Sequence, residues 1–338
     1  MKLGVIGATG VVGSTILTVL EERDLPVTQL FAYASRDRVD GVRFRGVAYP
    51  VARATVEKIV ADAPDVVFFA SSEDASKEMA EALAAHGIVV IDNSSTFRLD
   101  PRVPLVIPEV NPHAIEAHHM IFPVGNCTAI ILCVALKPIA DAAGLQSVRV
   151  ATYQAVSGAG RAGLEALAEE EALLATGASG PAPNTTFAAQ IARNVIPQVG
   201  GFDGSGDTGE EEKLAAETRK TLELPALHVA ATTVRVPVRT AHSEAVFIET
   251  ERPTSVATLA AAFARAPGIV YHATGIVTPI DVEGTDLVHV ARLRAEGTST
   301  THFQLWIVGD QLRKGAATNG VQILETLMSQ GRFGAVHA

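Results

Sequence analysis

The sequence predicts an α/β protein of two domains: a parallel, doubly wound sheet followed by an α+β domain built on a mixed sheet. Three observations lead to this prediction. The chain opens with a short apolar strand, a glycine-rich turn and an amphipathic helix. Apolar strands and helical segments then alternate up to about residue 126, as in a parallel sheet. The strands expected after this point alternate apolar and polar residues, which suits a sheet with one face packed on helices.

The first strand and helix enclose a spaced set of glycines. Lys2 to Gly7 predicts a strand and Ser14 to Glu22 a helix, and between them lie Gly7, Gly10 and Gly13. Small residues let the chain turn tightly and bring backbone N–H groups and the helix N-terminus up to a pyrophosphate. This context favours a Rossmann-like dinucleotide-binding domain. The alternative is a tight strand–helix turn that binds nothing.

A short polar segment follows the next expected strand, Leu30–Ala34, and bears on the choice of dinucleotide. An acidic residue about 20 positions past the glycines binds the ribose of NAD, whereas an arginine accommodates the 2′-phosphate of NADP. This chain offers Ser35, Arg36, Asp37 and Arg38. The two arginines favour NADP, while Asp37 leaves NAD possible. Further along, we expect a strand at 66–70, a helix at 74–86 and a strand at 88–91.

The composition excludes several classes of protein. The chain has 338 residues, of which 48% are hydrophobic and 19% charged, so extended disorder is not expected. Its net charge of −10, without a basic run, argues against a nucleic-acid partner. Two cysteines provide no disulfide framework, which suits a reducing compartment. Since we find neither a signal-peptide pattern nor an apolar run long enough to span a membrane, we expect a cytoplasmic protein.

Cys127 is the candidate nucleophile. It follows a strand expected at Ile121–Val124 and precedes a helix expected at 128–142. A cysteine at a helix N-terminus experiences the positive end of the helix dipole, which favours the thiolate. The alternative is an inert buried thiol. That interpretation fits Cys133 better, because its neighbours are apolar and it falls inside the helix.

His242 is the histidine that we select as a catalytic base. It lies between a strand expected at 229–238, which carries Arg235, and a second strand expected at 244–250. A histidine at a strand end suits general acid–base work, although a turn histidine is the alternative. A Cys–His pair can form an acyl-thioester. Together with a nicotinamide cofactor, this pair suggests an enzyme that reduces an activated acyl group to an aldehyde, or runs the reverse reaction.

Several sequence blocks, taken in chain order, resemble the aspartate-β-semialdehyde dehydrogenase family. They are the glycine turn, Asn93-Ser94-Ser95 with Phe97-Arg98, Val103–Asn111, Asn126-Cys127-Thr128, Tyr153–Gly160, Asn194–Pro197, Glu210–Lys213 with Glu217-Thr218, Arg235–Val238 with His242, and Gly309–Ala317. The blocks cover the chain from residue 7 to about 325. One departure precedes the cysteine, where Gly125 replaces the proline that the family usually has.

The resemblance implies a role for each matching residue. Cys127 would be the nucleophile, His242 the acid/base that activates it, and Gln154 would orient the acyl intermediate. The implied substrate contacts are Arg235 with the α-carboxylate, Glu210 with the α-ammonium group, Arg98 and Lys213 with phosphate, and Asn126 beside the nucleophile. The implied NADP contacts are Gly7, Thr9, Gly10, Val11, Val12, Gly13, Ser35, Arg36, Arg38, Ser71, Ser157, Gly158 and Asn319. No metal site is implied.

Simpler interpretations remain for two of these residues. Thr208 and Glu211 form a capping-box pattern, so Glu211 would serve only to start a helix. Glu210 and Lys213 lie three residues apart, which alone favours an exposed ion pair on a helix.

The resemblance also implies a domain organisation and an oligomer. Residues 1–126, completed by a C-terminal helix within 314–338, would form the dinucleotide-binding domain, and 127–313 the catalytic and dimerisation domain. Small molecules would be its substrates, and the protein would be a homodimer or homotetramer. Two other functions stay open: N-acetyl-γ-glutamyl-phosphate reductase, against which Glu210 argues because an amide nitrogen carries no charge, and a non-catalytic nucleotide-binding paralogue.

Overall fold

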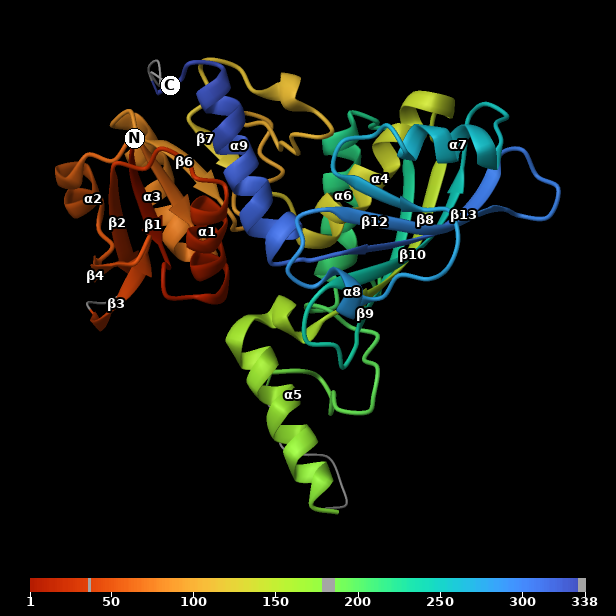
Figure 1. Cartoon of the computed structure of the whole chain (residues 1–338), viewed down its shortest axis with the longest axis horizontal. Helices are drawn as coiled ribbons and strands as arrows, with labels where there is room; N and C mark the ends of the chain where they lie inside the picture. The colour runs from red at the N-terminus through yellow and green to blue at the C-terminus, as the bar shows by residue number, and fades with distance from the viewer. Residues whose placement is uncertain (36–37, 178–185, 334–338) are drawn as a thin grey trace. The chain divides into compact units, whose positions relative to one another are not determined.

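The structure, a computed structural model, describes residues 1–35, 38–177 and 186–333. The chain forms two compact units, one of residues 1–125 with 316–338 and the other of residues 126–315 (Figure 1). Asn126 therefore opens the second unit rather than closing the first. Within the described residues no helix is both long and apolar enough to cross a membrane.

The first unit is built on a sheet that has seven strands in the described part of the chain. They are β1 (Lys2–Ile6), β2 (Gln29–Ala34), β3 (Arg38–Phe44), β4 (Val47–Arg53), β5 (Val66–Phe69), β6 (Val89–Asp92) and β7 (Ile121–Pro123). Their order is β3-β4-β2-β1-β5-β6-β7, and every pair is parallel except β3–β4. The strand order reverses between β1 and β5: the strands that follow β1 first extend the sheet on one side of it, and those from β5 onward extend it on the other side. Open α/β sheets bind their ligands at such a point.

Helices cover both faces of this sheet. They are α1 (Val11–Glu22), α2 (Val56–Asp62), α3 (Glu73–Ala85) and α9 (Thr318–Ser329), with a short 3₁₀ turn η1 (Pro112–Ala114). Val67 and Phe69 pack with Ile59 of α2 and Met79 of α3 in one buried cluster. On the opposite face, α9 packs on the sheet at Gly320, where an added Cβ would lie 3.2 Å from the Phe68 ring. This two-sided burial explains the continuous apolar sequence of β5.

The β3–β4 hairpin and α2 were missed by the sequence analysis. The hairpin turns at Arg45-Gly46, where both residues have positive φ, 50° and 74°. Glycine tolerates this conformation, but arginine is not a residue that marks such a turn. The N-cap of α2 is Thr55, whose side chain accepts the Lys58 amide.

The second unit contains a mixed sheet of six strands among the described residues, in the order β11-β12-β13-β10-β8-β9. The strands are β8 (Ser147–Gln154), β9 (His228–Arg235), β10 (His242–Glu249), β11 (Ile269–His272), β12 (Val288–Ala295) and β13 (His302–Gly309). Its helical elements are α4 (Cys127–Ala143), η2 (Val156–Ala159), α5 (Gly160–Ala175), α6 (Gly209–Leu222), α7 (Val256–Phe263), α8 (Pro279–Val282) and the π-turn η3 (Arg313–Ala317). The α/β class and the mixed sheet agree with the prediction.

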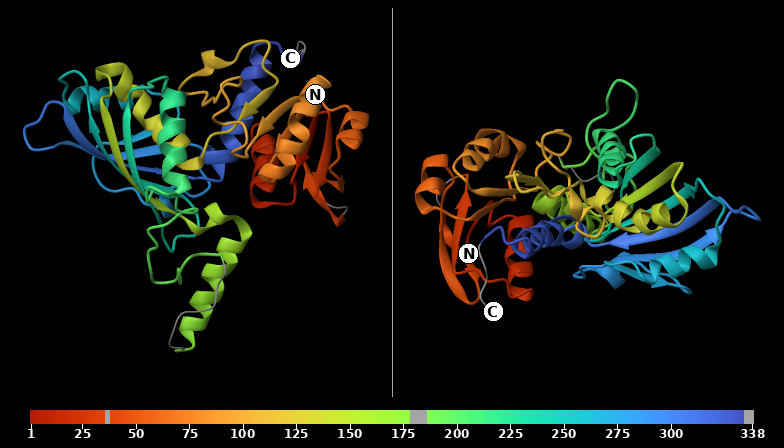
Figure 2. Two further views of the ribbon diagram at one scale, coloured as in Figure 1. Left: turned by 180° about the vertical axis from the view of Figure 1, so that it is seen from behind. Right: turned by 90° about the horizontal axis from the view of Figure 1, so that it is seen from above.

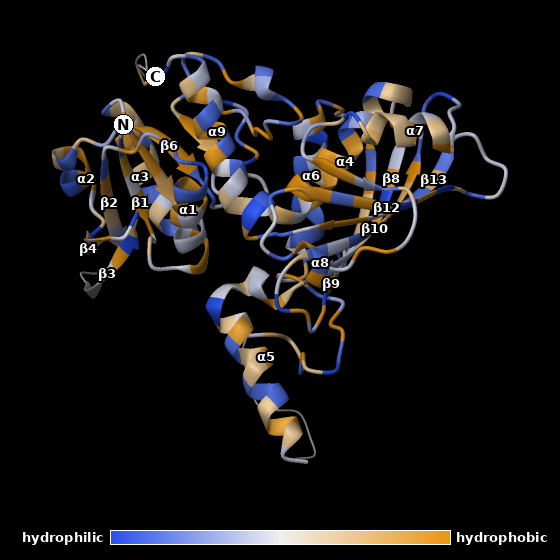
Figure 3. Ribbon diagram, in the orientation of Figure 1, coloured by the Kyte–Doolittle hydropathy of each residue, from blue (hydrophilic) through white to orange (hydrophobic). Residues whose placement is uncertain are grey.

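One face of the six-stranded sheet is covered by α4, α6 and α7, and α5 extends away from the sheet (Figures 1 and 2). Figure 3 shows hydrophobic residues along α4 and along the strands beneath it. In β10, Val246 and Ile248 are buried while Phe247 between them is 40% exposed. The strand therefore has one covered and one open face, as its alternation predicts.

Two predicted boundaries in this unit were wrong, and both bear on the site. The strand expected to run to Val238 ends at Arg235, because Pro237 has no N–H to donate and the Val238 amide bonds to the Val236 carbonyl instead, at 2.8 Å. His242 does not precede the next strand but is the first residue of β10. Its position in the sheet fixes the direction of its side chain.

Candidate active site

Cys127 is the first residue of α4, and Asn126 is the N-cap of that helix. The Asn126 side-chain oxygen accepts the amides of Thr128 and Ala129, at 3.0 and 3.3 Å. The Asn126 backbone amide donates to the buried Glu217 carboxylate, at 2.5 Å. The peptide before the cysteine is thus fixed from both sides, and the half-buried Cys127 lies at the positive end of α4.

Glu210, at the start of α6, is held between two side-chain amides. Its carboxylate accepts from Asn126 at 3.0 Å and from Gln154 at 2.9 Å. Gln154 in turn accepts the Thr152 hydroxyl at 3.1 Å. Residues separated by up to 84 positions in the chain therefore converge next to Cys127. The carboxylate lacks an ion-pair partner within the described residues, which suits a site for a cationic group.

Arg235, at the end of β9, supplies positive charge to the same place. Its side chain is only 6% exposed, and Nη1 donates to the Ala155 carbonyl at 2.7 Å. The guanidinium also lies over the Phe187 ring, 5.7 Å from its centroid. Burial lowers the pKa of Arg235, while its electrostatic interactions with Cys127 and with the Glu210 carboxylate raise it. Arg235 is therefore electrostatically coupled to both groups.

His242 is fully buried and oriented by the backbone. Its Nδ1 accepts the Ala155 amide at 3.0 Å, so Ala155 orients both the histidine and, through its carbonyl, Arg235. Nε2 has no hydrogen-bond partner in the described structure. Burial lowers the pKa of His242 well below its ordinary value, and the nearby Arg235 charge lowers it further. His242 is consequently neutral at physiological pH.

Two glycines make room for this arrangement. An added Cβ on Gly158, in η2, would lie 2.8 Å from Nη1 of Arg235 and 3.4 Å from Nε2 of His242. An added Cβ on Gly315 would lie 2.9 Å from Cβ of Cys127. Ser157, next to Gly158, accepts a hydrogen bond from the buried Gln311 amide. The sequence analysis assigned Gly158 and Ser157 to the cofactor but missed Gly315, although it lies within a block that carries the resemblance.

The simpler interpretations are resolved differently for each residue. The Thr208–Glu211 capping box is confirmed, with the Thr208 amide donating to Glu211 at 2.7 Å. The ion pair expected between Glu210 and Lys213 is absent, and Lys213 forms no salt bridge with the described residues. Cys133 is fully buried in α4, and burial raises its pKa, so it is an inert core thiol as predicted.

The first unit contains a cavity of about 870 Å³ along the carboxyl ends of β1, β2 and β5. Gly7, Thr9, Gly10, Ser35 and Ser71 line it. The glycines leave no room for side chains: a Cβ on Gly7 would lie 2.2 Å from the Ala70 carbonyl oxygen, and one on Gly13 would lie 2.2 Å from the Gly7 carbonyl oxygen.

Two further observations indicate that this cavity fits a dinucleotide. Helix α1 begins here at Val11 and Val12, with Gly10 as N-cap and no side-chain cap for its amides. The Ser71 hydroxyl is buried without a hydrogen-bond partner in the described part of the chain. The amides at the start of α1 and the Ser71 hydroxyl could donate hydrogen bonds to a pyrophosphate, and the glycine turn leaves room for it.

The other predicted cofactor and phosphate residues have distinct positions. Arg36 and Asp37 lie outside the described residues, and Arg38 opens β3. Arg53, which the sequence analysis missed, ends β4 and lines the cavity beside Ser35. In the same unit, Arg98 donates to the carbonyls of Val124 and Asn93, at 2.8 and 2.9 Å. Asn319 is buried in α9 and donates to the Val106 carbonyl at 3.0 Å.

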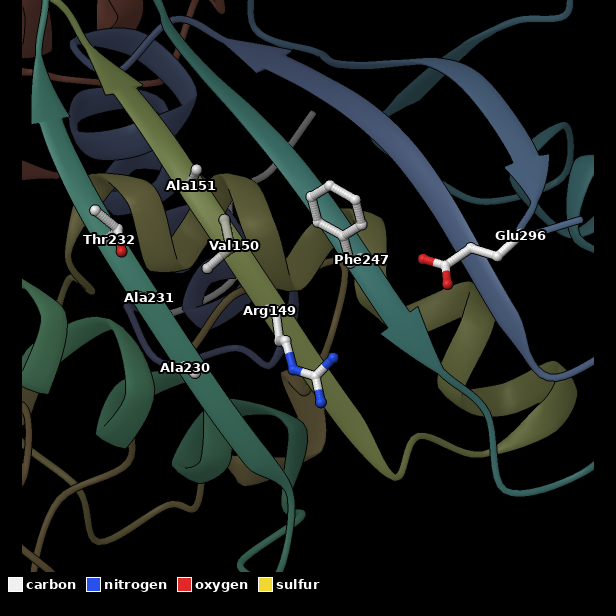
Figure 4. Close-up of a pocket in the computed structure, with 8 residues that line it drawn as sticks. All are labelled: Arg149, Val150, Ala151, Ala230, Ala231, Thr232, Phe247 and Glu296. Carbon is white, nitrogen blue, oxygen red and sulfur yellow. The ribbon is translucent and has the colours of Figure 1, made fainter.

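The open face of the six-stranded sheet carries a second hollow, of about 420 Å³ (Figure 4). Arg149, Thr232 and Phe247 line it from three adjacent strands. None of the residues to which the resemblance assigns a catalytic role lines this hollow. Across the described residues, His, Cys, Asp and Glu side chains form no cluster of three or more that could hold a metal ion.

Comparison with known proteins places both units in one family. Residues 2–118 match the family described as "Semialdehyde dehydrogenase, NAD binding domain", and residues 136–314 match "Semialdehyde dehydrogenase, dimerisation domain". Aspartate-semialdehyde dehydrogenase 2 of Vibrio cholerae is 42% identical over 331 residues, covering 97% of each chain. Aspartate-semialdehyde dehydrogenase of Aquifex aeolicus is 41% identical over 338 residues, covering 98% of each.

A solved structure shows the same relationship. Aspartate semialdehyde dehydrogenase II from Vibrio cholerae, complexed with ASA, superposes with a TM-score of 0.93 at 41% identity, covering 97% of this chain and 98% of that one. Sequence identity and fold agree over nearly the whole length of both chains. The chain belongs to the aspartate-semialdehyde dehydrogenase family.

Proposed function

We propose that this protein interconverts L-aspartyl β-phosphate and L-aspartate-β-semialdehyde with NADP and phosphate, through a thioacyl intermediate on Cys127. In the cell this reaction would serve lysine, threonine and methionine synthesis. The observation that carries the proposal is the convergence of a half-buried cysteine at a helix N-terminus with Arg235 and Glu210. A thiol nucleophile and two opposite charges match an acyl group attached to an amino acid.

The two charged residues would recognise the two ends of the amino acid. Arg235 has a planar guanidinium whose second nitrogen can bind a carboxylate while Nη1 stays on the Ala155 carbonyl. Glu210 would bind the α-ammonium group, since its carboxylate already lies between two amide donors. An N-acetylated substrate has no such cation, and the Glu210 carboxylate would then lack a charged partner. Glu210 therefore favours the free amino acid.

Cys127 would carry the acyl group. Its sulfur attacks the carbonyl carbon of the acyl phosphate, the tetrahedral species collapses, and phosphate leaves with the electrons of the broken C–O bond. Gln154 and His242 would provide hydrogen bonds around the acyl group. When bound, the nicotinamide cofactor supplies or accepts the hydride that interconverts thioester and aldehyde. Lys213 and Arg98 would bind the phosphate.

The cofactor would be held by the first unit. Gly7, Gly10 and Gly13 would bring the backbone up to the pyrophosphate, and Ser71 would donate its unpaired hydroxyl. We propose NADP rather than NAD because Arg36 and Arg38 follow β2 and Arg53 lines the cavity nearby. Together, the charges of Arg36, Arg38 and Arg53 would outweigh that of Asp37 in binding a 2′-phosphate.

The second unit would join two copies of the chain. Its match is to a dimerisation domain, and its sheet leaves one face open. Tyr153 and Phe247 are 37% and 40% exposed on this face. Aromatic residues are enriched in interfaces between proteins. A homodimer would bury them.

The proposed reaction can be tested with purified protein and L-aspartate-β-semialdehyde. Reduction of NADP⁺ that requires phosphate, that exceeds the reduction of NAD⁺ and that is lost in Cys127→Ala would support the proposal. N-acetyl-glutamate-γ-semialdehyde serves as the comparison substrate. If it were oxidised faster than L-aspartate-β-semialdehyde, the assignment of Glu210 to an ammonium group would be wrong. A folded protein inactive on both substrates would be a binding paralogue.

A further inference from the structure

Residues 186–197, which come after α5 in the chain, form an irregular segment that lies against Arg235. All of these residues are described by the structure, and they form no helix and a single β-bridge, between Ile196 and Arg235. In this bridge the Arg235 amide donates to the Ile196 carbonyl at 2.8 Å, and the Ile196 amide donates to the Arg235 carbonyl at 2.9 Å. The segment therefore holds the backbone of Arg235 at the end of β9.

The same segment also contacts the guanidinium group of Arg235. Its Phe187 ring lies against this group, with 5.7 Å between the ring centroid and Cζ. On the other side, Nη1 donates to the Ala155 carbonyl at 2.7 Å. The guanidinium therefore lies between a carbonyl that follows β8 and a ring that belongs to segment 186–197. A movement of the segment would change the direction of the guanidinium.

A buried carboxylate of α5 holds this segment in place. Glu170 is 1% exposed, and its Oε2 accepts the backbone amides of Ile191 and Ala192, both at 2.7 Å. Ile191 and Ala192 are themselves fully buried. Hydrogen bonds to an ionised acceptor are roughly twice as strong as those between neutral groups. If the carboxylate were removed, two buried N–H groups would lose this acceptor, and the segment would have to move to replace it.

The apolar contacts of this segment fix its position less narrowly. Leu167 and Leu174 lie three and four residues from Glu170 on one face of α5, and they pack in a cluster with Ile191 and Ile196. Apolar contacts have no preferred direction. Two hydrogen bonds to one oxygen, in contrast, fix two consecutive peptide groups. Glu170 thus provides the directional contact between α5 and the segment.

We propose that Glu170 is a positioning residue for substrate binding. By holding segment 186–197, it directs the Arg235 guanidinium at the α-carboxylate of the substrate, and it acts through Arg235 rather than as a catalytic residue. The block Asn194–Pro197, to which the resemblance assigns no role, contains the Ile196 that bonds to Arg235. This inference deepens the proposed function and rests on it for the role of Arg235.

Glu170 acts through position rather than through its charge. The groups that are electrostatically coupled to Arg235 are Cys127 and Glu210. Glu170 therefore matters as the acceptor of two N–H groups, and the oxygen of a glutamine can also accept them. Glu170→Gln thus separates positioning from an effect of charge.

The first experiment needs no substrate. It compares the wild type with Glu170→Ala, Glu170→Gln and the control Glu171→Ala, whose glutamate is exposed on the same helix. Hydrogen–deuterium exchange follows the amides of Ile191 and Ala192, and phenylglyoxal modification, analysed by peptide mass spectrometry, follows Arg235. In Glu170→Ala both rates should rise by at least about tenfold, the usual effect of losing a hydrogen bond to a charged group. Both should stay near the wild-type values in Glu170→Gln and Glu171→Ala.

Two outcomes of this experiment would overturn the proposal. Unchanged exchange in Glu170→Ala would mean that the carboxylate does not hold the segment. Faster exchange with an unchanged modification rate at Arg235 would mean that the segment does not place the guanidinium. Because neither outcome depends on the substrate, the proposal can fail here while the proposed function stands.

The second experiment measures substrate binding by the same proteins. Glu170→Ala should raise KM for L-aspartate-β-semialdehyde about tenfold with little change in kcat, because misplacing a group by about 1 Å can cost up to roughly 10²-fold. Glu170→Gln should restore most of the wild-type KM. With 3-aminopropanal, the same aldehyde without the α-carboxylate, Glu170→Ala and the wild type should have equal kcat/KM. Equal losses on both aldehydes, or a lower Tm with an unchanged KM, would reduce Glu170 to a structural role and overturn the proposal.

A milder variant covers the case in which Glu170→Ala does not fold. Glu170→Asp keeps the carboxylate but shortens the side chain by one methylene, so that its oxygen falls short of the two amides. It should raise KM more than Glu170→Gln does, although glutamine lacks the charge, and the opposite order would contradict the proposal. If even the wild type did not oxidise L-aspartate-β-semialdehyde, the proposed function would fail, and the exchange and modification rates would still decide whether Glu170 places Arg235.

Discussion

Gly315→Ala is expected to impair catalysis by displacing the nucleophile. The new Cβ would lie 2.9 Å from Cβ, 3.3 Å from Cα and 3.4 Å from the carbonyl oxygen of Cys127. Ordinary van der Waals contacts begin at 3.4 Å, so the first of these distances must increase by about 0.5 Å. The atoms belong to the first residue of α4 and not to a flexible side-chain end. Either the start of the helix or η3 must move.

The size of the effect follows from this displacement. Misplacing a reacting group by about 1 Å can cost roughly 10²-fold in rate, so a shift half as large should cost on the order of tenfold in kcat. Overpacking should also cost about 1–3 kcal/mol of stability. Gly201→Ala is a matched control, because an added Cβ there meets no atom within 4 Å.

Steady-state kinetics and thermal melts of both variants give the answer. We expect Gly315→Ala to lower kcat and the alkylation rate of Cys127, while Gly201→Ala behaves as the wild type. Wild-type kcat in a folded Gly315→Ala protein would refute the idea that close backbone contact at Gly315 positions Cys127.

Further predictions concern stability, cofactor choice and assembly. Glu244 is fully buried, and burial raises its pKa well above 4.5, so above pH 4.5 the unfolded chain loses this proton while the folded chain keeps it; the free energy of unfolding then falls by about 1.4 kcal/mol per pH unit until the folded pKa is reached. Glu244→Gln should therefore raise Tm more at pH 8 than at pH 5, whereas the exposed control Glu251→Gln should not. The same dependence of Tm on pH in the wild type and in Glu244→Gln would disprove this. Arg53→Leu should lower kcat/KM for NADP⁺ roughly tenfold with little change for NAD⁺, whereas equal losses would remove Arg53 from the 2′-phosphate site. Phe247→Arg should convert a dimer to a monomer in light scattering, while Ile280→Arg, at a side chain 86% exposed on α8, should not; an intact Phe247→Arg dimer would place the interface elsewhere.

The fold could be predicted where the burial of a strand produces a clear pattern of apolar residues in the sequence. The residues of β5, Val66–Phe69, are apolar because the strand is covered on both faces, and the alternation in β10 reflects its single covered face. The β3–β4 hairpin could not be predicted in this way, since its turn uses Arg45 at positive φ and its strand β3 lies at the edge of the sheet. The end of β9 was also predicted wrongly from the local sequence, because Pro237 ends the strand although the residues around it are apolar.

The site could be predicted only in part, because its contacts join distant segments. Cys127 was identifiable from the glycine, asparagine and apolar helix around it. No local pattern shows that the Glu210 carboxylate meets Asn126 and Gln154 rather than Lys213, or that Ala155 holds both His242 and Arg235. These contacts depend on how β8, β9 and β10 lie side by side. Spacing along the chain cannot supply that information.

The covalent step is tested most directly by the mass of the protein during turnover. Protein is incubated with L-aspartate-β-semialdehyde and NADP⁺ in the absence of phosphate, and is then analysed by intact and peptide mass spectrometry. The account predicts an aspartyl adduct on the peptide that contains Cys127, its absence in Cys127→Ala, and its rapid discharge when phosphate is added. Turnover without an adduct, or an adduct on Cys133 alone, would contradict it.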